Sequence, residues 1–123
     1  MDKLTFKEVY LTQKELQKFM GLNLDEMSIK EKMSYVKEHS FWISDEISEM
    51  IHELPFMKPW SKKHEKLSDE ELQQMIKNGK KEFIDVFTFF LNVMLGLNFD
   101  VDELFEMYME KNKENINRQK NGY

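Results

Sequence analysis

Two pairs of acidic residues stand in stretches that are otherwise rich in apolar side chains. Glu46 and Glu49 form one pair, while Glu82 and Asp85 begin the strongly apolar run 82–91. A spacing of three residues puts both carboxylates of a pair on one face of a helix. Ionised carboxylates inside a protein are unfavourable unless positive charge neutralises them. If the two helices pack together, the four acids are predicted to face one pocket and to bind Mg²⁺.

The ordinary alternative is that lysines such as Lys58 or Lys80 pair with these acids in surface salt bridges. One pair of acids at this spacing is common on helices and favours that alternative. Two pairs, each at the inner edge of its helix, favour the metal site. On the second helix Phe89 and Asn92 continue the line of the acids at successive turns.

A second set of polar residues follows one face of the last predicted helix. Tyr108, Lys111, Asn115 and Arg118 are spaced by three, four and three residues, and Asn112 flanks them. Cations and amides of this kind could hold a polyphosphate on the side away from its metal ions. The alternative is a solvated face, where basic residues near a helix C-terminus are favourable in any case.

Gln13 and Gln17 lie one turn apart on the first predicted helix. Their amides could read the edge of a pyrimidine, because each offers a donor and an acceptor. The commoner alternative is a pair of surface glutamines. Trp60, in the basic and aromatic loop 55–67, could stack on a base or could cover the end of a helical bundle.

The elements that carry these residues are predicted to be helices throughout. Glycine (4) and proline (2) are scarce, and no segment shows the alternation of a strand. Ser28 and Ser68 each precede a glutamate by three residues, which is the pattern of a capping box. Ser40 is expected to separate two helices and Pro55 to end one. The predicted helices span residues 5–20, 28–39, 41–54, 69–95 and 101–119.

The predicted fold is therefore all-α, a four- or five-helix bundle. Its central helix would be residues 80–95, which carry apolar side chains on nearly every side. A helix that is apolar all round is buried all round. Because one short bundle can hardly cover such a helix, we expect a homodimer or a higher homo-oligomer to complete it.

Composition limits the classes of protein that remain. The 123 residues suit a single domain over 1–123, and 41% hydrophobic residues suffice for a core. No cysteine is present, so thiolate zinc sites and disulfides are excluded. A net charge of −5 argues against a nucleic-acid partner. No apolar run suits a membrane span or a signal peptide, so we expect a cytoplasmic protein with no membrane partner.

These motifs together resemble the all-α nucleoside triphosphate pyrophosphohydrolases, whose mark is ExxE followed by ExxD. Within that superfamily the chain is most similar to the dimeric dUTPases. The similarity covers nearly the whole chain, and its most specific block is the C-terminal one. Besides the two acidic motifs, it rests on residues 11–17, 56–62 and 108–123.

The resemblance implies a role for each of these residues. It implies two or more Mg²⁺ ions, replaceable by Mn²⁺, held by Glu46, Glu49, Glu82 and Asp85. It implies Gln13 and Gln17 at the uracil, with Lys58 and Trp60 near the nucleotide. The remaining substrate-binding residues that it implies are Tyr108, Lys111, Asn112, Asn115, Arg118 and Tyr123.

The activity implied is hydrolysis of dUTP to dUMP and pyrophosphate, with attack at the β-phosphorus and with dUDP as a further substrate. Glu49, in preference to Glu46, is expected to orient the attacking water and to take its proton. Gln17 departs from the shorter Asn or Asp of the family, which leaves base choice open. One alternative is an enzyme for dCTP or a modified nucleotide, and another is a non-catalytic helical adaptor or regulator. A compact chain of this kind suits a bacterial or phage source.

Overall fold

The computed structural model describes residues 3–54, 60 and 62–122, without the side chains of residues 63 and 64. Within these residues the secondary structure is helical and no strand is present, so the all-α prediction is confirmed. Short 3-10 helices occupy Leu24–Glu26 and Lys63–Lys66. The four α-helices are α1 (Phe6–Phe19), α2 (Ile29–His52), α3 (Asp69–Gly96) and α4 (Val101–Lys120).

Helix starts follow the capping signals in the sequence. Ser28 and Ser68 each cap a helix through a complete capping box, as predicted. Thr5 caps α1 in the same way with Glu8, a box that the sequence analysis did not predict. Asp100 takes the cap position of α4, although its side chain makes no capping hydrogen bond.

The predicted break at Ser40 is wrong, because α2 runs unbroken from Ile29 to His52. The Ser40 hydroxyl donates to the Val36 carbonyl at 2.7 Å, one turn back in the same helix. A serine whose hydroxyl is bonded in this way does not end a helix, because the hydroxyl no longer competes for the hydrogen bonds of neighbouring backbone groups. Helix α3 is also unbroken and runs through Gly79.

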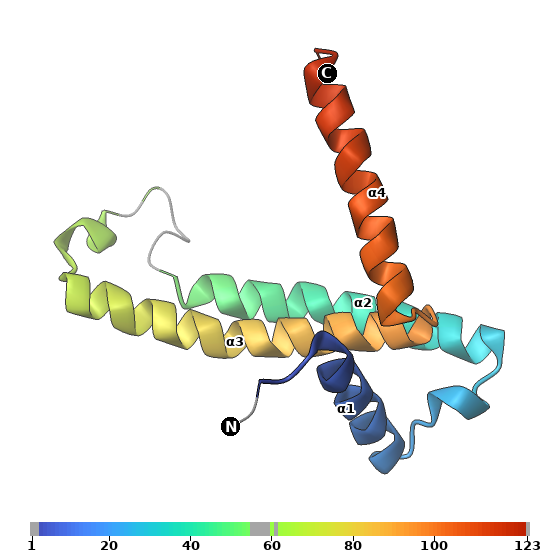
Figure 1. The fold of residues 1–123 in the computed structure, drawn as a ribbon. Coiled ribbons are helices and arrows are strands. Elements are labelled where there is room, and N and C mark those ends of the chain that lie inside the picture. The colour runs from blue at the N-terminus through green and yellow to red at the C-terminus, as the bar shows by residue number, and fades with distance from the viewer. Residues whose placement is uncertain (1–2, 55–59, 61, 123) are drawn as a thin grey trace.

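The longest packing contact in the fold is made by α2 and α3, which lie antiparallel and side by side (Figure 1). Their register is visible in the contacts along the pair. A Cβ added at Gly96 would meet Val36 Cγ2 at 2.5 Å, and one added at Gly79 would meet Leu54 Cδ2 at 3.3 Å. Successive turns of α2 therefore face successive turns of α3 in reverse order.

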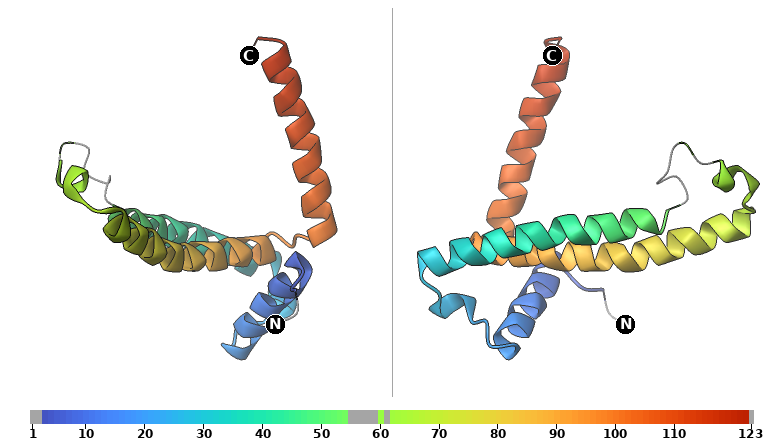
Figure 2. Two further views of the ribbon diagram at one scale, coloured as in Figure 1. Left: turned by 60° about the vertical axis from the view of Figure 1, so that its left-hand side comes forward. Right: turned by 180° about the vertical axis from the view of Figure 1, so that it is seen from behind.

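Helix α1 lies across the pair near the C-terminal half of α3 and the N-terminal half of α2, where the core is formed (Figure 2). The Tyr10 hydroxyl donates to the Phe99 carbonyl at 2.9 Å and so links α1 to the chain after α3. The buried apolar residues of the core are Tyr10, Leu24, Tyr35, Leu91, Leu95 and Val101.

Helix α4 leaves the pair steeply, since the chain bends by 102° between α3 and α4. Its first turns pack on α1, with the Phe105 ring 5.7 Å from the ring of Phe6. Every described residue from 105 to 122 is exposed. In the single chain α4 is thus attached to the fold at its base.

Helix α3 is not covered all round by the rest of the chain. Val86 and Leu91 are buried, whereas Phe83, Ile84 and Phe90 remain about half exposed. Among the described helices none alone is long and apolar enough to cross a membrane, and only the bent pair α3 and α4 passes that test jointly.

The two glycines of α3 give a matched test of the α2–α3 register. Gly96→Ala would force a Cβ against Val36, a β-branched side chain that cannot easily move. We expect this variant to lose about 1–3 kcal/mol of unfolding free energy. Gly79→Ala meets only the flexible end of Leu54 and gains helix propensity.

Urea unfolding followed by circular dichroism measures both variants. We expect a lower midpoint for Gly96→Ala, and an equal or higher midpoint for Gly79→Ala. Equal effects of the two substitutions would contradict the register.

Candidate functional site

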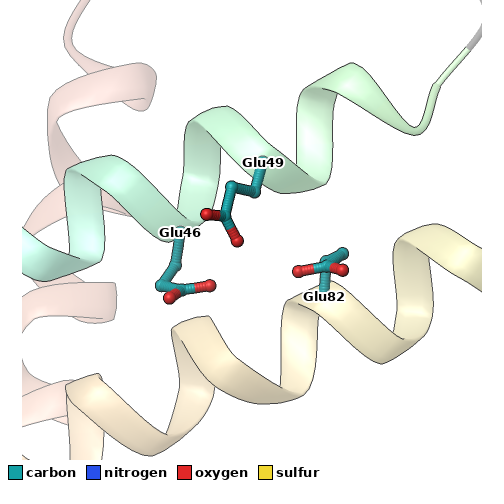
Figure 3. Close-up of side chains that lie close together, drawn as sticks. All are labelled: Glu46, Glu49 and Glu82. Atoms are coloured by element: carbon teal, nitrogen blue, oxygen red, sulfur yellow. The ribbon is translucent and has the colours of Figure 1, made fainter.

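Three carboxylates from α2 and α3 meet between the two helices. Glu46 and Glu49 project from α2 toward α3, and Glu82 projects from α3 toward them (Figure 3). One oxygen from each lies within 4.8 Å of one from each of the others. We call these three residues the acidic trio. Their spacing suits oxygen ligands that share one centre of positive charge.

Repulsion among these acids is visible in their proton affinities. Burial raises the pKa of the Glu46 carboxyl above its ordinary 4.5, and the negative charges of Glu49 and Asp85 add to the effect. Burial and the charges of Glu49 and Asp85 likewise raise the pKa of Glu82. Asp85, though exposed and outside the trio, is therefore part of the same electrostatic cluster.

Of the predicted lysine partners, Lys80 forms no ion pair with the trio among the described residues, and Lys58 lies outside them. The ion pairs found among the described residues are Lys14–Asp25 and Lys111–Glu114, at 2.8 and 3.5 Å. The Glu46 Oε2 atom is sealed from solvent and has no hydrogen-bond partner there. A buried acceptor without a donor is unfavourable. Hard oxygen donors with unmatched negative charge fit a divalent cation such as Mg²⁺.

An aromatic wall follows the acids along the same helix pair. The Phe89 ring of α3 lies 5.8 Å from the Trp42 ring and 5.5 Å from the His39 ring of α2. The His39 ring lies 4.7 Å from Trp42 on its own helix. Toward the core, Trp42 stands one turn and His39 two turns from Glu46, and Phe89 stands one turn from Asp85.

Beyond this wall the polar side chains form a buried network. Gln13 Nε2 donates to Asn92 Oδ1 at 2.9 Å, and Asn92 Nδ2 lies 3.2 Å from His39 Nδ1. The Tyr35 hydroxyl donates to Gln17 Oε1 at 2.8 Å. All five side chains are buried. The surface-glutamine alternative for residues 13 and 17 is therefore wrong.

In the described part of one chain, the remaining predicted substrate residues do not join the acidic trio. Trp60 is described and 78% exposed, whereas Lys58 and Tyr123 lie outside the described residues. The predicted residues of α4 are all exposed on the helix that leaves the pair. They are Tyr108, Lys111, Asn112, Asn115 and Arg118.

Sequence reasoning left three members of this site out. Tyr35, His39 and Trp42 continue the face of α2 that carries Glu46 and Glu49, at spacings of three and four residues. The false break at Ser40 hid that continuous face. On α3 the sequence did show Phe89 and Asn92 in line with the acids, although neither was assigned a role.

Comparison with known proteins gives two kinds of match. A family model described as "dUTPase" matches residues 68–123. A "dCTP pyrophosphatase" of Enterobacteria phage T4 is 30% identical over 106 residues, covering 74% of this chain and 62% of the relative. A protein of the same name from Enterobacteria phage LZ5 is 30% identical over 108 residues, covering 76% of this chain and 63% of the relative.

A "DNA replication protein" of phage T4 is 27% identical over 100 residues, covering 69% of this chain and 26% of the relative. No solved structure matches the chain. The chain thus spans under two thirds of the length of these phage relatives. The family model and the phage matches confirm the family resemblance that the motifs carry.

The raised pKa values predict how the metal-free protein responds to pH. Because Glu46 and Glu82 hold protons more tightly when folded, their contribution is fully present below the ordinary pKa of 4.5. It is lost as the pH rises through the raised pKa. In EDTA, we expect Glu46→Gln to melt progressively higher than the wild type as the pH rises above 4.5.

Glu31 supplies a control of opposite sign. Hydrogen bonds from Ser28 lower the pKa of Glu31, so its stabilisation is present above 4.5 and lost in acid. We expect Glu31→Gln to melt lower than the wild type at pH 7. Thermal unfolding of the three proteins from pH 4 to 8 would refute the cluster if Glu46→Gln and the wild type stayed parallel.

Proposed function

We propose that this chain is a member of the all-α dUTPase family and a Mg²⁺-dependent nucleoside triphosphate pyrophosphohydrolase that converts dUTP to dUMP and pyrophosphate. The observation that carries the proposal is the acidic trio, whose charge no cation neutralises within the described residues. A triphosphate with its divalent cations supplies that missing charge balance. The match of residues 68–123 to the dUTPase model supports the same activity.

The trio and Asp85 are the residues that would hold Mg²⁺. The chemistry that Mg²⁺ supplies when bound is positive charge, which polarises phosphate oxygens and the attacking water. Mn²⁺ would serve in the same way, since it accepts the same oxygen ligands. Two or more ions are proposed, because the cluster carries four carboxylates.

Glu49 is the residue proposed to take the proton of the attacking water. Its side chain is exposed, whereas Glu46 is partly buried and its Oε2 atom is sealed from solvent. The water oxygen forms a bond to the β-phosphorus while the bridging oxygen leaves with the α-phosphate. The proton of the attacking water passes to the Glu49 carboxylate. The same attack on dUDP would release phosphate.

The base would lie toward the buried amides at the core end of the helix pair. The aromatic wall, formed by Phe89, Trp42 and His39, separates the acids from Gln13 and Asn92. Phosphates held at the trio would thus leave the base beside groups that can stack and hydrogen-bond.

The phosphate-binding residues of α4 need a second element of structure to reach a site. In one chain α4 stands away from the trio, and Phe83, Ile84 and Phe90 of α3 stay exposed. We propose that a second copy covers this apolar face. In such a dimer, α4 of one copy could also contact the second copy.

Hydrolysis of dCTP is the second candidate. Two phage relatives at 30% identity are named dCTP pyrophosphatases, and a glutamine amide carries both a donor and an acceptor for a pyrimidine. A non-catalytic adaptor is a third and weaker candidate. It would require lysines to pair with the acids, and no described lysine does so. Phage relatives favour a phage or bacterial source, and a cytoplasmic location stays a prediction.

A carboxylate exchange tests the catalytic role of Glu49. Glu49→Gln keeps the size of the side chain but removes the charge and the proton acceptor. We expect turnover to fall by about 10²-fold or more, while the circular dichroism spectrum is unchanged. Asp45→Asn is the matched control, since Asp45 is exposed on the same helix and outside the trio.

Turnover is measured as pyrophosphate release from dUTP with Mg²⁺. Activity of Glu49→Gln close to that of Asp45→Asn would reject the role of Glu49.

A nucleotide panel tests the substrate class. The panel is dUTP, dCTP, dTTP, dATP, dGTP and UTP, each with Mg²⁺ and again with EDTA. We expect hydrolysis of dUTP above the others, and loss of all activity in EDTA. Higher activity on dCTP would select the second candidate. Absence of hydrolysis, with no rise in melting temperature on adding Mg²⁺ and a non-hydrolysable dUTP analogue, would favour the adaptor.

A further inference from the structure

The buried amide network has one defined direction of hydrogen bonding. Gln13 Nε2 donates to Asn92 Oδ1, so the other end of the Asn92 amide, Nδ2, faces His39 Nδ1. Burial lowers the pKa of His39, which keeps the ring neutral near pH 7. A neutral ring with its proton on Nε2 has Nδ1 free to accept from Asn92. Each group in the chain thus fixes the orientation of the next.

The free end of the Gln13 amide is its oxygen. Gln13 Oε1 has no hydrogen bond to any described residue, yet Gln13 is 8% exposed overall. Among the described buried side-chain atoms, only Glu46 Oε2 is both sealed from solvent and unpaired. The Gln13 oxygen is therefore reachable from solvent, and it is an acceptor.

The Gln17 amide is oriented from the other side. Tyr35 donates to Gln17 Oε1 at 2.8 Å, so the Nε2 end remains as a donor, with only the Met20 sulfur at 4.0 Å beside it. A thioether is a weak acceptor and competes poorly with a base. The glutamine pair therefore offers one acceptor and one donor.

Uracil and cytosine differ in the order of the groups that such a pair would meet. Uracil carries an acceptor at O4 next to a donor at N3, whereas cytosine carries a donor at N4 next to an acceptor at N3. An acceptor and a donor held in fixed order match one base and leave both groups unpaired against the other. Reversal of the two amides would reverse the match.

We propose that Asn92, His39 and Tyr35 are positioning residues that fix the orientations of the Gln13 and Gln17 amides and thereby set the choice between uracil and cytosine. This inference rests on the proposed function. It assigns base selection to residues behind the glutamines, in the core, rather than to the glutamines alone.

Two buried tyrosines provide a matched test. Tyr35→Phe removes the hydroxyl that orients Gln17, while Tyr10→Phe removes a hydroxyl that donates to the Phe99 carbonyl at 2.9 Å. Each variant loses one buried hydrogen bond. We expect Tyr35→Phe to move the ratio of kcat/KM for dUTP and dCTP toward unity by about tenfold. Tyr10→Phe is expected to leave the ratio unchanged.

His39→Phe is the second variant. It keeps an aromatic ring against Tyr35 and Trp42 but removes the Nδ1 acceptor that holds Asn92. We expect the ratio of kcat/KM for dUTP and dCTP to move toward unity in this variant also. An unchanged ratio in both Tyr35→Phe and His39→Phe, or an equal fall in Tyr10→Phe, would overturn the inference.

The ring nitrogens of His39 give a readout that needs no turnover. In the wild-type protein at pH 7, nitrogen NMR should show Nδ1 without a proton and Nε2 with one. A proton on Nδ1 would require the Asn92 and Gln13 amides to be reversed, and would overturn the order given above.

The outcomes separate the two proposals. If the wild type hydrolyses dUTP and dCTP equally well, the inference is overturned and the proposed function stands. If it hydrolyses no nucleotide, the proposed function fails and the inference falls with it.

Discussion

The register of α2 against α3 is the constraint on which the rest of the structure depends. It is visible at Gly96, where an added Cβ would lie 2.5 Å from Val36 Cγ2, so that a side chain at this position would displace Val36. Given that contact, antiparallel packing places His39 opposite Asn92 and places Glu46 and Glu49 opposite Glu82. A shift of one turn would separate the acids and break the amide network together. The relative positions of the acids and of the buried amides are therefore both fixed by the register of α2 against α3.

The two halves of the site meet opposite physical demands. At the trio, carboxylates are held close although their charges repel and burial disfavours ionisation. At the core end, amides are buried, and they are tolerated because each finds a partner. The aromatic wall of Phe89, Trp42 and His39 lies between them. One end thus carries negative charge that no described residue neutralises, while the other end is already hydrogen-bonded within the chain. With the proposed divalent cations at the trio, such an arrangement would suit a ligand with an anionic end and a hydrogen-bonding planar end.

Much of this followed from the sequence, and the failures have physical causes. Capping boxes at Ser28 and Ser68 gave correct helix starts, because a cap is a local interaction between residues near in sequence. The acidic motifs were correctly expected to converge, with Asp85 just outside the trio. Ser40 misled, because whether a serine breaks a helix depends on packing that the local sequence does not contain. That error cut one face of α2 into two and hid the residues that hold Asn92. The burial of Gln13 likewise depends on a partner 79 residues away.

Helix α4 carries a consequence for folding cooperativity. Its first turns are anchored through Phe105 and the buried Val101, and every described residue from 105 to 122 is exposed. Isolated helices of this length are marginal in water, and the ion pair between Lys111 and Glu114 is a contact within α4 rather than with the core. The distal turns of α4 should open and reclose many times for each global unfolding event, and their amide protons should exchange first. Any surface that captures α4 must supply the free energy of completing this helix as well as that of contact. The packed core and the exposed turns of α4 are thus expected to unfold with different free energies within one short chain.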